Sequence, residues 1–300
     1  MQECIYTVYN DARNQIEDLI VNKLELVDFL LMFTGKVNRN ELMEIADISI
    51  ATATRTLTQY RETYADNIEY NIGKKRYDAT RQFSPAFTHN CISALKAMAY
   101  GQRLEPTKLL TTIGPDSIAS IDVSLNTDLV SKICRAIYAG HALKAAYVSS
   151  TENYKNRERL ILPTAIFESR NNWYVRACDL SDNTTYKNFK LIRFNDAKTA
   201  EFNKEVPDDI EWRSKVTLTI GPHIKHPNPE ALKLDLGLLD KPVVNLIVSE
   251  ALAGFVLAEL GVDSSANSIL NPFHFQYCLL NRYELENLNS LILAPGFNEK

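Results

Sequence analysis

The sequence predicts an α+β protein built from several domains, and three observations support this prediction. The chain has 300 residues, whereas one compact domain usually takes roughly 100 to 200. Apolar residues recur at helical spacing between residues 24 and 60, but residues 143–194 break into short strand-like runs. Hydrophobic residues make up 45% and charged residues 23% of the chain, which is typical of a folded globular protein and excludes a disordered or fibrous one.

The N-terminal unit is predicted to contain three helices separated by short breaks at residues 35–40 and 47–49. Each helical segment places apolar side chains along one face, as a helix that packs on its neighbours must. These residues are Leu24, Val27, Leu30 and Leu31 in the first helix, Leu42 and Ile45 in the second, and Ile50, Ala53, Leu57 and Tyr60 in the third.

The third helix has the features of a DNA-reading helix. Ser49 precedes it and is a suitable N-cap, because its hydroxyl can accept a hydrogen bond from a free backbone N–H of the first turn. The face of this helix opposite its apolar stripe carries short polar side chains and a guanidinium group. Such groups can reach base edges and phosphates when a helix enters the major groove. A plain amphipathic helix with a solvated polar face is the alternative. The predicted reading residues, opposite the apolar stripe, are Thr52, Arg55, Thr56 and Gln59, with Ser49 at the start.

A basic hairpin follows this helix. Residues 68–72 and 76–79 alternate like short strands, and the segment between them has the composition of a tight turn. Lys74, Lys75 and Arg76 lie at its tip and can neutralise phosphates. A helix-turn-helix followed by a basic wing predicts a winged helix-turn-helix DNA-binding domain over residues 1–83, followed by a helical connector over residues 84–127.

The charge of the chain is unevenly distributed. The overall net charge of −4 argues against a protein that binds nucleic acid over its whole surface. Residues 129–205, however, carry 13 basic and 8 acidic groups, whereas residues 206–300 carry 7 basic and 12 acidic groups. This asymmetry predicts separate units with different partners.

The middle unit, residues 128–205, is predicted to be a small β-barrel that follows an amphipathic helix over residues 128–139. Strand patterns cover residues 143–149, 159–167, 173–179 and 187–194, with turn-rich stretches between them. Alternation places Trp173, Val175 and Ala177 on one face, where Trp173 is expected in the core, and Phe189, Leu191 and Arg193 together on a face of the last strand.

Two stretches of this unit, RLILPTAIFESRNNWYVRACDL and NFKLIRF, resemble the WYL domain of bacterial WYL-family transcriptional regulators. Val175 takes the place of the leucine in the Trp-Tyr-Leu motif. The resemblance spans about residue 20 to about residue 260. It implies a winged helix-turn-helix, an Sm-like or SH3-like β-barrel WYL domain, and a small α/β C-terminal dimerisation domain over residues 206–300. The layout most resembles the repressors that guard phage-defence gene clusters such as BREX and CBASS.

The same resemblance implies a ligand-sensing surface in the WYL domain. Its residues map onto Ser149, Arg159, Tyr174 and Arg193, although Thr164 replaces a histidine that is common in the family. Two guanidiniums with hydroxyls and an aromatic ring suit phosphates and a stacked base. The implied effector is a nucleotide, a cyclic oligonucleotide or a single-stranded nucleic acid.

These features predict a cytoplasmic, homodimeric repressor that binds a palindromic double-stranded operator and is nucleoid-associated when bound to DNA. The alternative is an accessory module of a defence or DNA-repair complex that binds single strands through the barrel. Catalytic constellations, cofactor motifs and metal motifs are not evident. His223 and His226 are spaced like a metal pair but lie among prolines, and the five cysteines are far apart and expected to be buried thiols. Residues 243–260 are expected to form a helix that does not span a membrane, because Glu250 and Glu259 interrupt it.

Overall fold

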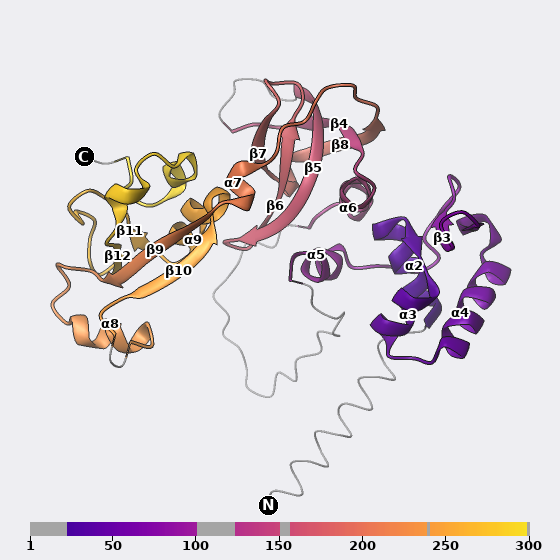
Figure 1. Ribbon diagram of the computed structural model, residues 1–300, viewed down its shortest axis with the longest axis horizontal. Coiled ribbons are helices and arrows are strands. Elements are labelled where there is room, and N and C mark those ends of the chain that lie inside the picture. The colour runs from indigo at the N-terminus through magenta and orange to yellow at the C-terminus, as the bar shows by residue number, and fades with distance from the viewer. Residues whose placement is uncertain (1–22, 101–123, 151–156, 239–240, 299–300) are drawn as a thin grey trace, which may run out of the picture. The chain divides into compact units, whose positions relative to one another are not determined.

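The computed structural model describes residues 23–100, 124–150, 157–238 and 241–298 (Figure 1). The chain forms two compact units. The first comprises residues 1–168 and 172–205, and the second comprises residues 169–171 and 206–300. The mixture of helices and sheets confirms the predicted α+β class.

The N-terminal part of the first unit is a winged helix fold. Asn38 caps α3 through its side-chain oxygen, and Ser49 caps α4, whose Thr52 N–H donates to the Ser49 hydroxyl at 3.2 Å. The predicted cap is therefore confirmed. Three short strands form an antiparallel sheet in the order β1-β3-β2. The elements are α2 (Lys23–Thr34), β1 (Lys36–Val37), α3 (Arg39–Ala46), α4 (Ile50–Thr63), β2 (Ile68–Asn71) and β3 (Arg76–Ala79).

The core of this winged helix contains the predicted stripe of α4 with one exception. Ala53, Leu57 and Tyr60 are buried together with residues of α2 and α3. Ile50, however, is 50% exposed, so the prediction that it belongs to the core is wrong. It occupies the first position of α4, one turn before the buried stripe begins.

The rest of the first unit is a five-stranded antiparallel sheet with two helices. The strand order is β7-β6-β5-β4-β8. Among the described strands no pair joins β7 to β8, so closure into a barrel stays a prediction. The elements are α5 (Cys91–Tyr100), α6 (Thr127–Ala139), β4 (Ala142–Tyr147), β5 (Arg157–Ser169), β6 (Asn172–Asp179), β7 (Thr185–Lys190) and β8 (Phe194–Ala200).

The predicted last strand, residues 187–194, is divided in the structure. A 3-10 turn at Leu191–Arg193 separates β7 from β8, so the prediction that Phe189, Leu191 and Arg193 share a strand face is wrong. The turn lets the chain cross from β6, the partner of β7, to β4, the partner of β8. Trp173, by contrast, is 5% exposed and lies in the core as predicted.

The second unit contains a four-stranded sheet in the order β10-β9-β12-β11. The predicted helix over residues 243–260 is wrong, because its first half is β10, paired along its length with β9, and only its second half is helical. No helix among the described residues is long and apolar enough to cross a membrane. The elements are α7 (Ile210–Arg213), β9 (Lys215–Pro222), α8 (Pro229–Asp235), β10 (Val244–Ser249), α9 (Ala253–Glu259), β11 (Val262–Asp263) and β12 (Tyr277–Leu279).

Candidate nucleic-acid interface

The exposed face of α4 is the first part of the candidate interface. Arg55 and Gln59 are one turn apart and both exposed, and Ser49 is exposed at the start of the helix. Thr52 is half-buried, with its hydroxyl 2.9 Å from that of Ser49. Thr56 is only 5% exposed, and its hydroxyl donates to the Thr52 carbonyl at 3.0 Å. The prediction that Thr56 shares the exposed polar face is therefore wrong.

The tip of the wing is the second part of the interface. The side chain of Asn71 shapes it, accepting a hydrogen bond from the Lys74 backbone N–H at 3.0 Å. Lys75 has a left-handed backbone (φ 51°), so this residue, rather than Gly73, provides the unusual conformation of the turn. Lys74 and Lys75 are both exposed. Arg76 is half-buried, with Nε 2.6 Å from Asp78 Oδ1, so its charge is already paired within the wing.

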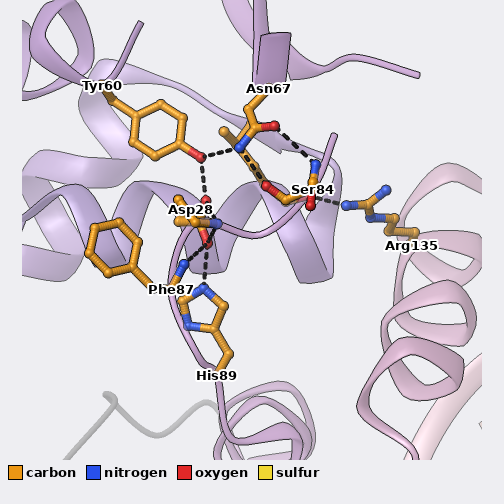
Figure 2. Close-up of polar contacts among 9 residues, drawn as sticks. Asp28, Tyr60, Asn67, Ser84, Phe87, His89 and Arg135 are labelled. Carbon is orange, nitrogen blue, oxygen red and sulfur yellow. Dashed lines mark hydrogen bonds and ion pairs between the residues drawn. The ribbon is translucent and has the colours of Figure 1, made fainter. Parts of the chain in front are cut away.

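A buried carboxylate lies behind α4. Asp28 in α2 is fully buried and accepts hydrogen bonds from the hydroxyl of Tyr60 in α4 and from the backbone N–H groups of Ala86 and Phe87. Nε2 of His89 lies 2.7 Å from Asp28 Oδ2, and both side chains are almost inaccessible. Figure 2 shows how these donors converge on Asp28 from separate parts of the chain.

Asn67, just before the wing, extends this arrangement. Its side chain exchanges two hydrogen bonds with the backbone of Ser84, at 2.7 and 2.9 Å, and donates to the Tyr60 hydroxyl at 3.3 Å (Figure 2). Residues 84–89 are thereby attached both to α4 and to the base of the wing. We refer to Asp28, Tyr60, Asn67 and His89 as the Asp28 cluster.

The protonation state of this cluster follows from its hydrogen bonds. Burial disfavours the charge of Asp28, but the hydrogen bonds from His89, Tyr60 and the Ala86 N–H favour it more, so the pKa of Asp28 lies below its usual value. Burial and, next, the hydrogen bond to Asp28 raise the pKa of Tyr60. Asp28 is therefore a carboxylate and Tyr60 a neutral donor at neutral pH.

The predicted ligand residues of the WYL sheet lie in different settings. The Arg193 guanidinium donates to the Ser150 hydroxyl at 2.9 Å, and the Arg193 carbonyl accepts from the Val148 N–H, so Arg193 and Ser149 lie near each other beyond the end of β4. Tyr174 is half-buried and stacks face to face with Phe167, with ring centroids 5.2 Å apart.

Arg159 departs most from the predicted surface, because it is 3% exposed. Its Nη1 lies 2.6 Å from Oδ2 of the fully buried Asp179, and Lys187 Nζ lies 3.2 Å from the same oxygen. Since two cations share this buried carboxylate, Arg159 belongs to a buried charge network rather than to an open surface. Whether these residues bind a ligand stays a prediction.

His223 of the second unit is hydrogen-bonded within the fold rather than open to a metal ion. His223 is buried, and its Nδ1 accepts from the Lys225 backbone N–H at 3.2 Å, so Nε2 carries the proton toward Asp263 Oδ2 at 3.1 Å. No group of three metal-ligating side chains occurs among the residues that the structure describes. Cys91, Cys134, Cys178 and Cys278 are free and buried, as predicted, whereas Cys4 lies outside the described residues.

Sequence reasoning missed two charged residues that hold α2 to its neighbours, Asp28 and Arg135. Arg135 in α6 donates from Nε to the Met32 carbonyl at 2.6 Å and from Nη2 to the Leu31 carbonyl at 3.0 Å. One signal pointed to Asp28: it interrupts an otherwise apolar helical segment, and a charge there needs buried partners.

Family comparisons agree with this architecture. Residues 20–98 match the BrxR transcriptional regulator winged helix-turn-helix domain, and residues 128–199 match the WYL domain.

The chain is also similar to proteins described as "DNA-binding transcriptional repressor CapW". It is 25% identical to the one from Pseudomonas aeruginosa over 89% of this chain and 90% of that protein. It is also 25% identical to the one from Escherichia coli (strain KTE188), over 88% and 89%. Transcriptional repressors are not enzymes, which agrees with the prediction that the chain is a regulator without catalytic activity.

Among solved structures, the chain is similar to the proteasome accessory factor B/C (PafBC) of Arthrobacter aurescens, with 13% identity over 90% of this chain and 45% of that chain. The TM-score of 0.27 is too low to support an inference. The chain therefore contains one region that matches a BrxR-type winged helix-turn-helix domain and another that matches a WYL domain, and over most of its length it is similar to the CapW transcriptional repressors.

Proposed function

We propose that the chain is a homodimeric transcriptional repressor of an anti-phage defence operon. Residues 1–83 bind DNA, residues 84–127 connect, residues 128–205 sense an effector, and residues 206–300 dimerise. The two domain matches and the repressor names of the relatives support this assignment. Such a protein acts in the cytoplasm and is nucleoid-associated when bound to DNA.

The exposed face of α4 beside the basic wing carries the proposal. In the major groove Arg55 can donate to base edges and Gln59 can donate or accept, while Lys74 and Lys75 at the wing tip can contact phosphates. Ser49 and Thr52 can add contacts at the start of the helix. Arg76 contributes less charge, because Asp78 already pairs with it.

A homodimer explains how such a small interface selects an operator. Two copies of α4 would enter successive major grooves about 34–36 Å apart, so the operator would be palindromic. The effector, a nucleotide or a nucleic-acid fragment, would bind the WYL domain at the predicted residues Ser149, Arg159, Tyr174 and Arg193. It can alter DNA binding only if it prefers one arrangement of the two reading helices over the other.

Binding to the DNA upstream of the gene tests this proposal. Lys75→Ala should lower the salt dependence of binding, because each phosphate contact contributes about 0.9 to the slope of log affinity against log salt, or roughly 1.8 per homodimer. Arg55→Ala should weaken binding of the operator by about 1–3 kcal/mol for each base that Arg55 reads. Lys198→Ala, which removes a 78% exposed lysine from β8, is the matched control and should bind like the parent. Binding of single strands alone would favour the accessory module instead.

The effector site is tested with substitutions chosen to disturb the fold of the sheet as little as possible. Arg193→Ala removes a half-buried guanidinium and should leave operator binding intact while abolishing the response to a single-stranded or cyclic oligonucleotide. Arg159→Ala would leave the buried Asp179 with less compensation and destabilise the sheet, so Arg159→Lys is the appropriate variant. If Arg193→Ala and Arg159→Lys both respond like the parent, the assigned pocket is wrong.

A further inference from the structure

One helix of the first unit belongs to two hydrophobic cores. In α2, Val27 and Leu31 pack in the core of the winged helix, whereas Met32 and Phe33 pack in the core of the WYL sheet. All four are buried. The DNA-binding part and the sheet therefore share an element, rather than being joined by a linker alone.

Arg135 fastens the end of this shared helix to the WYL side. Its guanidinium donates to the carbonyls of Leu31 and Met32, two of the last carbonyls of α2, and lies over the ring of Phe83 at 4.9 Å from the centroid. A cation is favoured at the C-terminus of a helix, where the aligned peptide dipoles give the last carbonyls partial negative charge. Lysine could not reproduce this contact, because it lacks the planar fork of donors.

The Asp28 cluster fastens the other side of the same helix to the reading helix and to residues 84–89. This segment leads directly into α5, whose Cys91, Ala94 and Leu95 are buried in the WYL core. Two routes thus connect α4 to the sheet: one through α2 and Arg135, the other through Asp28 and α5. A hinge between domains needs a segment with few buried contacts, and neither route has this character.

We propose that Arg135 is a positioning residue for the reading helix. Arg135 holds α2 to α6, so that the winged helix and the WYL sheet of one protomer move as a single body. The spacing between the two reading helices of a dimer then changes only when whole protomers rearrange, not when the winged helix swings. The part of this inference that concerns the dimer rests on the proposed function.

Distance measurements between spin labels test the proposal, first in the free protein and then with operator DNA. Labels would be placed at Arg61→Cys, exposed on α4, and Lys198→Cys, exposed on β8, in the full-length chain with Cys4 replaced by serine. The four described cysteines are buried and should not take up label. A large excess of unlabelled chain keeps each observed distance within one protomer.

The expected result is one narrow distance distribution in the parent, unchanged by operator DNA. Arg135→Met should broaden the distribution and weaken operator binding roughly tenfold, within the usual range for coupled sites. The width for Arg135→Lys should lie between those of the parent and Arg135→Met. Lys132→Met, which removes a partly exposed lysine of the same helix, should match the parent.

Three results would overturn the proposal: a broad or two-peaked distribution in the parent, a parent distance that shifts with DNA, or a narrow distribution in Arg135→Met. Thermal unfolding followed by circular dichroism shows whether Arg135→Met is folded. If it is not, Arg135→Lys is the deciding variant, and a distance distribution as narrow as the parent's in that variant would contradict the proposal. Because the widths of the parent and Arg135→Met distributions are measured without DNA, a failure to bind DNA would contradict the proposed function and leave this inference standing.

Discussion

Replacing Tyr60 with phenylalanine removes one hydroxyl from the middle of the Asp28 cluster and keeps the ring. The hydroxyl donates to the Asp28 carboxylate and accepts from Asn67. Asn67 keeps its hydrogen bond to Ser84, so the main loss is one donor to a buried charge. A hydrogen bond to a charged group contributes about 1.5–3 kcal/mol. We therefore expect the free energy of unfolding of the first unit to fall by about 2 kcal/mol.

Thermal unfolding followed by circular dichroism measures this loss. For a unit of this size, 1 kcal/mol corresponds to about 2–4 °C, so the midpoint should fall by roughly 4–8 °C. Tyr70→Phe, on a wing tyrosine that is 49% exposed, is the control and should shift the midpoint by less than about 1 °C. Equal shifts in the two variants, or no shift in Tyr60→Phe, would refute the idea that the Asp28 cluster stabilises the reading helix.

Three further predictions concern acid stability, thiol reactivity and packing. The pKa of Asp28 is lower in the folded protein than in the unfolded chain. Its contribution to stability is therefore present above about pH 4 and is lost as the pH falls through the folded pKa. A plot of unfolding midpoint against pH should be flatter at its acid end in Asp28→Asn than in the parent. Burial raises the pKa of Cys134 to about 12, so this thiol should react with a disulfide reagent only after unfolding, and rapid labelling of native protein at Cys134 would contradict its burial. A Cβ at Gly254 would lie 1.9 Å from the Ser290 carbonyl oxygen, so Gly254→Ala should destabilise the second unit by about 1–3 kcal/mol; Gly73→Ala, with its nearest atom at 3.6 Å, should have little effect in the same denaturation assay.

The winged helix could be predicted from the sequence because its signals are local. Helical spacing of apolar residues, the Ser49 cap and the basic turn between residues 72 and 75 each depend on residues close together in the chain. The two errors in predicting which residues of α4 are buried have a simple cause. Periodicity gives the direction of a side chain around the helix axis, but not which neighbour covers it. Thr56 is covered while Ile50 is not.

The positioning residues could not be predicted, because their partners are distant in the sequence. Asp28 meets the Ala86 and Phe87 N–H groups 58 and 59 residues away, and Arg135 meets the Leu31 carbonyl 104 residues away. Arg159 shows the same limit: a motif identifies an arginine that suits phosphates, but only the fold reveals that Asp179 already neutralises it in the interior.

The second unit shows where a short apolar run is ambiguous. Residues 243–260 are apolar enough for a helix, but the β-branched residues of its first half favour a strand, and β9 provides a partner over six residue pairs. The resulting strand alternates, with Ile247 73% exposed and Leu246 packed against the core. Pairing between distant strands, which no local pattern encodes, therefore decided the structure.

Hydroxyl-radical footprinting of the DNA upstream of the gene tests most directly whether two copies of α4 read an operator. The proposed function predicts two protected half-sites whose centres lie about 10–10.5 base pairs apart, or a multiple of this spacing. Protection should disappear in Arg55→Ala and be retained in Lys198→Ala. An unprotected duplex, a single protected half-site, or protection that persists unchanged in Arg55→Ala would contradict the claim.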